Sequence, residues 1–174
     1  VAEQDAELAA ATAALDVTVD EDEVAIDELC LSILARRQPL GSDLRFVALA
    51  LKIVTDLERI GDLASNVCRR AEHLSRIPRY SMHDGIARMA ECTQRMVHGA
   101  ITALVERDAE GARQILRLDD AVDDDYVAVF RDVLQTMQRH PTLIEPGLHA
   151  QTIAKLIERM ADHATNIAEQ VIFY

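Results

Sequence analysis

A seven-residue segment occurs twice in this chain. Residues 56–62 read DLERIGD, and residues 156–162, one hundred positions later, read LIERMAD. The same offset relates further positions on both sides of the segment, namely Ile53 and Ile153, Ala64 and Ala164, Asn66 and Asn166, and Val67 and Ile167. Self-similarity at a fixed period is typical of a duplicated supersecondary unit. We therefore predict two copies of one folding unit.

Composition indicates that this unit is helical. The chain has no Trp, only 3% aromatic residues and only six Gly. Strands favour β-branched and aromatic residues, whereas the abundant Ala, Leu, Glu, Asp and Arg of this chain are, for the most part, compatible with helices. Proline ends helices, and four prolines divide the chain. We predict an all-α fold with helices over about 5–37, 42–75, 82–107, 108–139 and 146–174, and Ser42 as the N-cap of the second.

The repeat extends beyond the central segment. Residues 5–7 match residues 108–110 at an offset of 103, and Pro39 matches Pro141 at an offset of 102. The helix predicted over 82–107 has no counterpart in the first half. We expect two tandem pseudo-symmetric three-helix bundles, residues 1–80 and 81–174, with the first helix of the first bundle missing from this chain. The alternative of one long coiled coil is disfavoured, because the prolines divide the chain into antiparallel lengths.

Helical periodicity separates apolar stripes from acidic faces. In the helix over 42–75 the expected core stripe is Phe46, Leu49, Ile53, Leu57, Ile60, Ala64 and Val67. In the helix over 5–37 the expected stripe is Leu8, Leu15, Val19, Ile26, Leu29 and Ile33. Glu58 and Asp62 lie off the core stripe and project side by side, about 6 Å apart at Cβ.

Each half of the chain carries two acidic pairs with i, i+4 spacing. The pairs are Asp16/Asp20 and Glu58/Asp62 in the first half, and Asp119/Asp123 and Glu158/Asp162 in the second. If the helices are antiparallel neighbours, four carboxylates meet on one outward-facing patch in each half. Such oxygen ligands suit magnesium, calcium, manganese or iron. A solvated acidic face is the alternative, since a chain with 30 Asp and Glu contains such pairs by chance.

Few other residues suggest chemistry. His163, Asn66 and Asn166 are candidates for completing a metal shell, although ordinary surface roles stay open. The sequence contains no HExxH, Cys-x-x-Cys or P-loop motif and no nucleophile–base arrangement that we recognise. A net charge of −12 argues against nucleic acid as a partner. The sequence therefore favours a binding protein over an enzyme.

The cysteines and the hydropathy indicate a compartment. Cys30, Cys68 and Cys92 lie in apolar helical context without disulfide or zinc spacing, which favours reduced thiols in a cytoplasmic protein. No apolar run reaches the 18 residues of a candidate membrane span. The chain begins within a helical pattern, so we expect it to be part of something longer.

Several motifs resemble those of the PhoU family of bacterial phosphate-uptake regulators. These are DLERIGD, IERMADH, EVAIDE at 23–28, RRQP at 36–39, SDLR at 42–45 and VIFY at 171–174. They cover nearly the whole chain in the family's order and spacing. The resemblance implies two three-helix bundles that hold metal at paired acidic motifs, as multinuclear iron in some members and as zinc or magnesium in others. Leu63 departs from the family pattern, which often has His there.

The resemblance also implies a function. It points to a non-enzymatic, cytoplasmic repressor of the phosphate-starvation response. Such an adaptor works with the phosphate ABC transporter ATPase and a sensor histidine kinase, is a homodimer, and associates with the membrane only through its partners. The alternatives are a carboxylate-bridged metal enzyme, which would need more histidine than His163 near the metal, and a metal-independent helical scaffold, which chelation would not affect.

Overall fold

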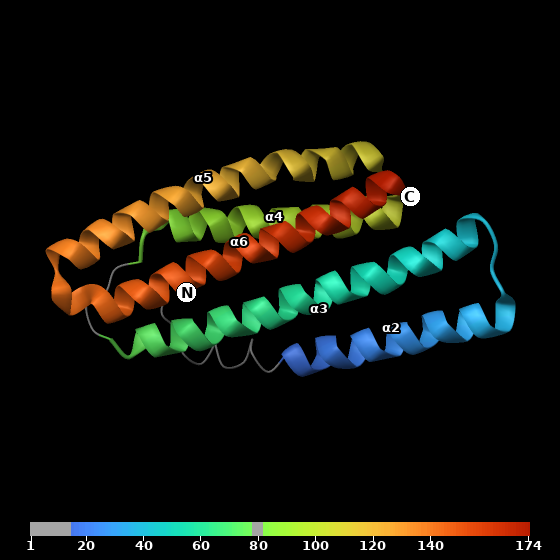
Figure 1. The fold of residues 1–174 in the computed structure, drawn as a ribbon, viewed down its shortest axis with the longest axis horizontal. Helices are drawn as coiled ribbons and strands as arrows, with labels where there is room; N and C mark the ends of the chain where they lie inside the picture. Colours follow the sequence, from blue (N-terminus) through green and yellow to red (C-terminus); the bar gives the residue numbers. More distant parts are fainter. Residues whose placement is uncertain (1–14, 78–81) are drawn as a thin grey trace.

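The structure is a computed structural model that describes residues 15–77 and 82–174 (Figure 1). In this part of the chain the elements are α2 (Asp16–Arg37), α3 (Ser42–Ser75), α4 (Asp84–Glu106), α5 (Ala109–Arg139), the 3-10 helix η1 (Pro141–Leu143) and α6 (Ile144–Phe173). The described residues contain no strand, so the all-α prediction is confirmed. None of the described helices is long and apolar enough to cross a membrane.

The helices form an elongated assembly in which consecutive long helices run antiparallel (Figure 1). Helix α6 packs against α3, α4 and α5, and α4 also packs against α5. Helix α2 lies at the edge, where α3 is its only neighbour among the described elements. The described part of the chain thus forms tandem helical units, α2–α3 and α4–α5–α6, that meet where α3 lies along α6. The predicted boundary between residues 80 and 81 lies outside the described residues and stays a prediction.

Most predicted helix ends are confirmed, two differ, and one is not tested. The predicted beginning of the first helix lies outside the described residues. Helix α3 is preceded by Gly41 at φ 59°, with no side-chain cap, so the prediction that Ser42 is the N-cap was wrong. Glycine adopts this left-handed region without a Cβ clash. Helix α6 begins at Ile144 rather than Pro146, because a proline in the first turn needs no backbone N–H donor.

The main core lies where α3, α4, α5 and α6 meet. The repeat-related residues Ile53 and Ile153 are both buried in it, as the duplication predicts. On α3, Leu49 and Val67 are also buried, and the rest of the predicted stripe is partly buried except at its start. Phe46 is exposed, and its ring lies beside that of Tyr174 at 5.9 Å between centroids.

A second buried seam lies between α2 and α3. Val47, Val54 and Leu63 on α3 are buried but lie outside the main core cluster, on the side that α2 covers. From α2, Cys30 is buried, whereas Leu29 is 59% exposed. The stripe predicted for this helix was therefore wrong in part: Leu15, Ile26 and Leu29 are exposed. Val19 and Ile33 are half-buried, and Leu8 lies outside the described residues. The seam with α3 buries a different face of α2.

Candidate functional site

All four acidic residues predicted for the second half come together between α5 and α6. Burial raises the pKa of Asp119 above its ordinary value, and the charges of Asp123 and Asp162 raise it further. Burial likewise raises the pKa of Asp123, and the charge of Glu158 adds to it. These repulsions place the four carboxylates within electrostatic range of one another. We call Asp119, Asp123, Glu158 and Asp162 the C-terminal acidic cluster.

A corresponding group lies between α2 and α3. Burial raises the pKa of Glu58; Arg59 opposes this effect, and the charges of Asp62, Glu23 and Asp20 reinforce it. We call Asp20, Glu23, Glu58 and Asp62 the N-terminal acidic cluster. Asp16 is the first residue of α2, and its side chain lies outside the described part of the chain. Glu23 was missed because it does not belong to an i, i+4 pair with Asp20.

The clusters do not face outward in full. The side chains of Glu58 and Glu158 are only 14% and 13% exposed, whereas that of Asp62 is 43% exposed. The outward orientation was therefore predicted correctly for Asp62 and Asp162 and wrongly for the two glutamates. Glu58 continues the line of Val54 on α3, and the seam with α2 covers this line.

A basic side chain pairs with the acidic residues of each cluster, but it comes from a different position of the repeat in the two halves. The Arg59 Nε atom lies 3.3 Å from Glu58 Oε2, and Arg59 Nη1 donates to Asp62 Oδ2 at 3.2 Å. In the second cluster Lys155 Nζ donates to both carboxylate oxygens of Glu158, at 2.5 and 2.6 Å. This hydrogen bonding raises the pKa of Lys155. The position one hundred residues before Lys155 is Thr55, so the N-terminal cluster has no equivalent lysine.

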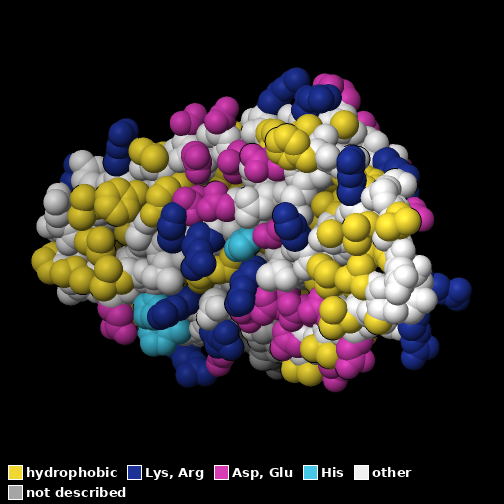
Figure 2. Space-filling model, turned by 45° about the vertical axis from the view of Figure 1, so that its right-hand side comes forward, with side chains coloured by type: hydrophobic (Ala, Val, Ile, Leu, Met, Phe, Trp, Pro, Cys, Tyr) yellow, Lys and Arg dark blue, Asp and Glu magenta, His cyan; other side chains and the backbone are white. Residues whose placement is uncertain are grey.

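The acidic residues fit a bound cation. Glu58 Oε2 is buried without a hydrogen-bond partner, and it lies 3.3 Å from Arg59 Nε. A buried carboxylate oxygen is stabilised only by a donor or a positive charge. Oxygen-only donor sets suit magnesium, manganese or iron better than zinc, which prefers nitrogen and sulfur. Figure 2 shows acidic side chains in two groups, one over α5 and α6 and one over α2 and α3.

The other candidates for a metal shell have different partners. His163 Nδ1 lies 2.8 Å from Asp56 Oδ1 on α3. Asn166 and Gln170 also donate to the Asp56 carboxylate, at 3.5 and 3.1 Å. Asn66 donates to the backbone oxygen of Asp62, not to a cluster carboxylate. The sequence analysis missed this network around Asp56, which joins the two units across the α3–α6 contact.

Fold and site together define a class: tandem helical bundles that carry a duplicated carboxylate motif at a helix seam. The family model described as "PhoU domain" matches residues 1–71 and 86–171 of the chain. The chain belongs to the PhoU family.

Individual relatives agree with this assignment. The phosphate-specific transport system accessory protein PhoU of Edwardsiella tarda is 35% identical over 98% of this chain and 70% of its own length. The crystal structure of PhoU from Pseudomonas aeruginosa has a TM-score of 0.93 at 38% identity, over 98% of this chain and 82% of that one. The phosphate transport system regulatory protein PhoU from Streptococcus pneumoniae has a TM-score of 0.88 at 26% identity, over 99% and 81%.

Proposed function

We propose that this chain is a non-enzymatic regulator of phosphate uptake and of phosphate-starvation signalling. The observation that carries the proposal is its 35% identity, over 98% of the chain, to a protein named as an accessory of the phosphate-specific transport system. The fold supports it, since the solved structures that it matches bear the same family name. In this role the chain is a cytoplasmic homodimer.

The partners in this proposal are the phosphate ABC transporter ATPase and its sensor histidine kinase. An adaptor needs surfaces rather than a reaction centre. One face of the elongated assembly presents two groups of acidic side chains, with Lys and Arg side chains between them (Figure 2). Such patterned charge favours partner selection and orientation. Contact with the membrane is then made through the transporter.

Metal at the acidic clusters is the second part of the proposal. Glu58, Asp62 and Asp20 with Asp16 would hold it in the first unit, and Asp119, Asp123, Glu158 and Asp162 in the second. A bound iron, magnesium or zinc ion supplies positive charge that offsets the repulsion among these carboxylates; the all-oxygen donor set favours the first two. The side chains themselves set the position, because each cluster joins two antiparallel helices. Occupied clusters would therefore fix α2 on α3 and α5 on α6.

The partner proposal is tested by co-purification. The tagged ATPase and the tagged kinase should each retain the chain, and its expression should repress a phosphate-starvation reporter in cells at high phosphate. The double variants Glu58→Gln/Asp62→Asn and Glu158→Gln/Asp162→Asn should lose repression. The matched control is Glu91→Gln/Glu106→Gln, which removes the same charge from exposed positions on α4.

The outcomes separate the two parts of the proposal. Absence of binding to both partners would contradict the adaptor role. If binding and repression survive both double variants and a chelator, the chain is a metal-independent scaffold instead. Turnover that requires the bound metal would favour the enzyme alternative.

A further inference from the structure

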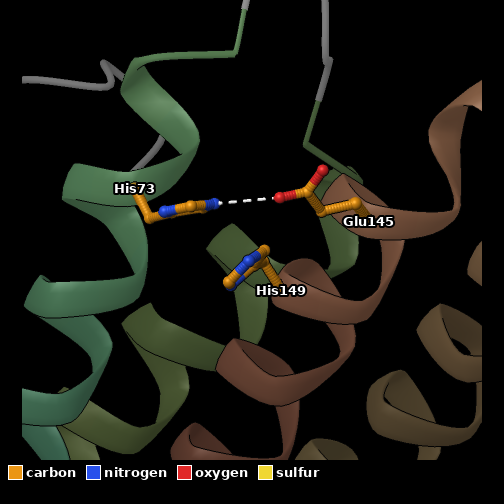
Figure 3. Close-up of side chains that lie close together, drawn as sticks. All are labelled: His73, Glu145 and His149. Atoms are coloured by element: carbon orange, nitrogen blue, oxygen red, sulfur yellow. Dashed lines mark hydrogen bonds and ion pairs between the residues drawn. The ribbon is translucent and has the colours of Figure 1, made fainter.

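Three side chains outside the acidic clusters converge at one end of the α3–α6 contact. His73 comes from the last turns of α3, and Glu145 and His149 come from the start of α6 (Figure 3). One ligand atom of each residue lies within 4.8 Å of those of the other two. His73 Nε2 is 3.4 Å from Glu145 Oε1, and the two imidazole rings are 4.2 Å apart between centroids. Figure 3 shows all three pointing into one space.

Secondary structure positions two of these groups together. Glu145 and His149 are spaced i, i+4, so they lie on the same face of α6. His73 completes the set from the neighbouring helix. The group is separate from the clusters described above: His73 follows Asp62 by eleven residues, about 16 Å along a helix. His149 precedes Glu158 by nine residues, about 14 Å.

We propose that His73, Glu145 and His149 form a binding site for a borderline divalent transition metal, with zinc as the preferred ion. Two imidazole nitrogens and one carboxylate oxygen are a donor set that zinc uses, with a fourth position left for water. Neither acidic cluster includes a nitrogen donor, so the two kinds of site differ in metal preference.

The geometry is close to that of a zinc site. Zinc–nitrogen bonds of about 2.0–2.1 Å bring the ligand atoms of a tetrahedron to about 3.4 Å from one another. The ligand atoms of His73, Glu145 and His149 lie within 4.8 Å of one another, so small side-chain rotations are enough to bring them to this distance. Such rotations are available, since the side chains of His73 and Glu145 are 45% and 71% exposed.

Arg70 lies beside the proposed site. Its Nη1 atom is 3.4 Å from His149 Nδ1. A guanidinium only donates, so Nδ1 accepts this hydrogen bond, and Arg70 has to turn away before this nitrogen can bind metal.

Occupation of this site would have a structural consequence. The metal would join the end of α3 in the first unit to the start of α6 in the second. Zinc should thus stabilise the contact between the two units at the opposite end from the turn between α2 and α3 (Figure 1).

The test is a zinc titration of the full chain in excess magnesium, which competes for the oxygen-only clusters. Calorimetry of the His73→Ala and His149→Ala variants should show zinc affinity at least about 10-fold weaker than that of the unaltered chain. Removing a group that only hydrogen-bonds to a metal ligand already weakens affinity by about 10-fold or more, so removing a ligand itself should cost no less. His98→Ala, an exposed histidine on α4, is the matched control and should bind as the unaltered chain does.

A second measurement needs no variant. In the unaltered chain, imidazole NMR resonances of two histidines should shift together as zinc is added, and those of His98 should not. The variants assign the shifting pair to His73 and His149. Unchanged zinc affinity in both variants, or shifts confined to other histidines, would overturn the proposal.

Discussion

The two units carry the same carboxylate motif in very different packing environments. In the second unit, α4, α5 and α6 enclose a core in which Met89, Met96, Val122 and Val129 are completely buried. Among the described residues of the first unit, α2 and α3 form only a seam, and Leu29 and Leu31 on α2 stay exposed. Even so, an acidic cluster lies between two helices of each unit, α2 and α3 in the first and α5 and α6 in the second. Among the described residues, the pairing of two antiparallel helices is therefore enough to bring these carboxylates together.

The largest expected effect tests this difference in packing. Met96→Ala in α4 should destabilise the protein by about 2–5 kcal/mol, because it leaves a cavity in a completely buried region. Leu29→Ala in α2 should cost less than about 0.5 kcal/mol, since an exposed side chain is removed. Urea unfolding measures both. A loss at Leu29 as large as that at Met96 would mean that the exposed face of α2 is covered in solution.

The next effect concerns the contact that joins the units. Asp56→Ala should cost about 1–3 kcal/mol, because His163, Asn166 and Gln170 lose their shared acceptor. The corresponding residue in the second unit is Leu156, so this network has no repeat-related copy. Lys52→Ala, an exposed substitution one turn earlier on the same helix, is the control.

A double-mutant cycle sharpens the assignment. Asp56→Ala and His163→Ala should couple by about 0.5 kcal/mol or more, as expected for direct partners. Additive effects would show that His163 and Asp56 do not stabilise the contact together. Apolar packing alone would then hold α3 against α6.

Much of the fold follows from local signals in the sequence. The repeat offset predicts that Ile53 and Ile153 share an environment, and the prolines predict the helix ends to within a few residues. The sequence also predicts which acidic pairs meet, because i, i+4 spacing and antiparallel pairing suffice to bring Asp119 and Asp123 to Glu158 and Asp162.

The remainder depends on which helix covers which face. The apolar residues of α2 mark two faces, and periodicity alone does not tell which one α3 buries. The same ambiguity explains why Glu58 and Glu158 were expected to point outward. His73 and Glu145 are 72 residues apart, and no local spacing connects them. Asp56 belongs to the duplicated segment, but its partners are determined by the contact between units.

A smaller effect tests the cation that distinguishes the clusters. Thr55→Lys places a lysine where the second unit has Lys155, three residues before Glu58. In the absence of metal it should stabilise the protein by about 0.2–0.5 kcal/mol, the usual value for such a helical ion pair. Metal affinity at the N-terminal cluster should fall, because the lysine competes for Glu58. Thr55→Gln is the uncharged control. Equal effects of Lys and Gln would exclude the proposed role of the charge.

The smallest effect has opposite signs with and without metal. Without metal, Asp162 repels Asp119, so Asp162→Asn should raise the free energy of unfolding by about 0.3 kcal/mol. With saturating divalent metal the same change should lower it, because a bound ion stabilises the folded state by RT ln(1 + [L]/Kd) and the variant binds more weakly. The measurement is the melting temperature of both proteins in chelator and in metal. Asp62→Asn should repeat the reversal in the first unit if α2 and α3 alone complete a site. A reversal in the second unit only would show that the third helix is needed for metal binding, and equal shifts in both conditions would reduce Asp162 to a solvated surface acid.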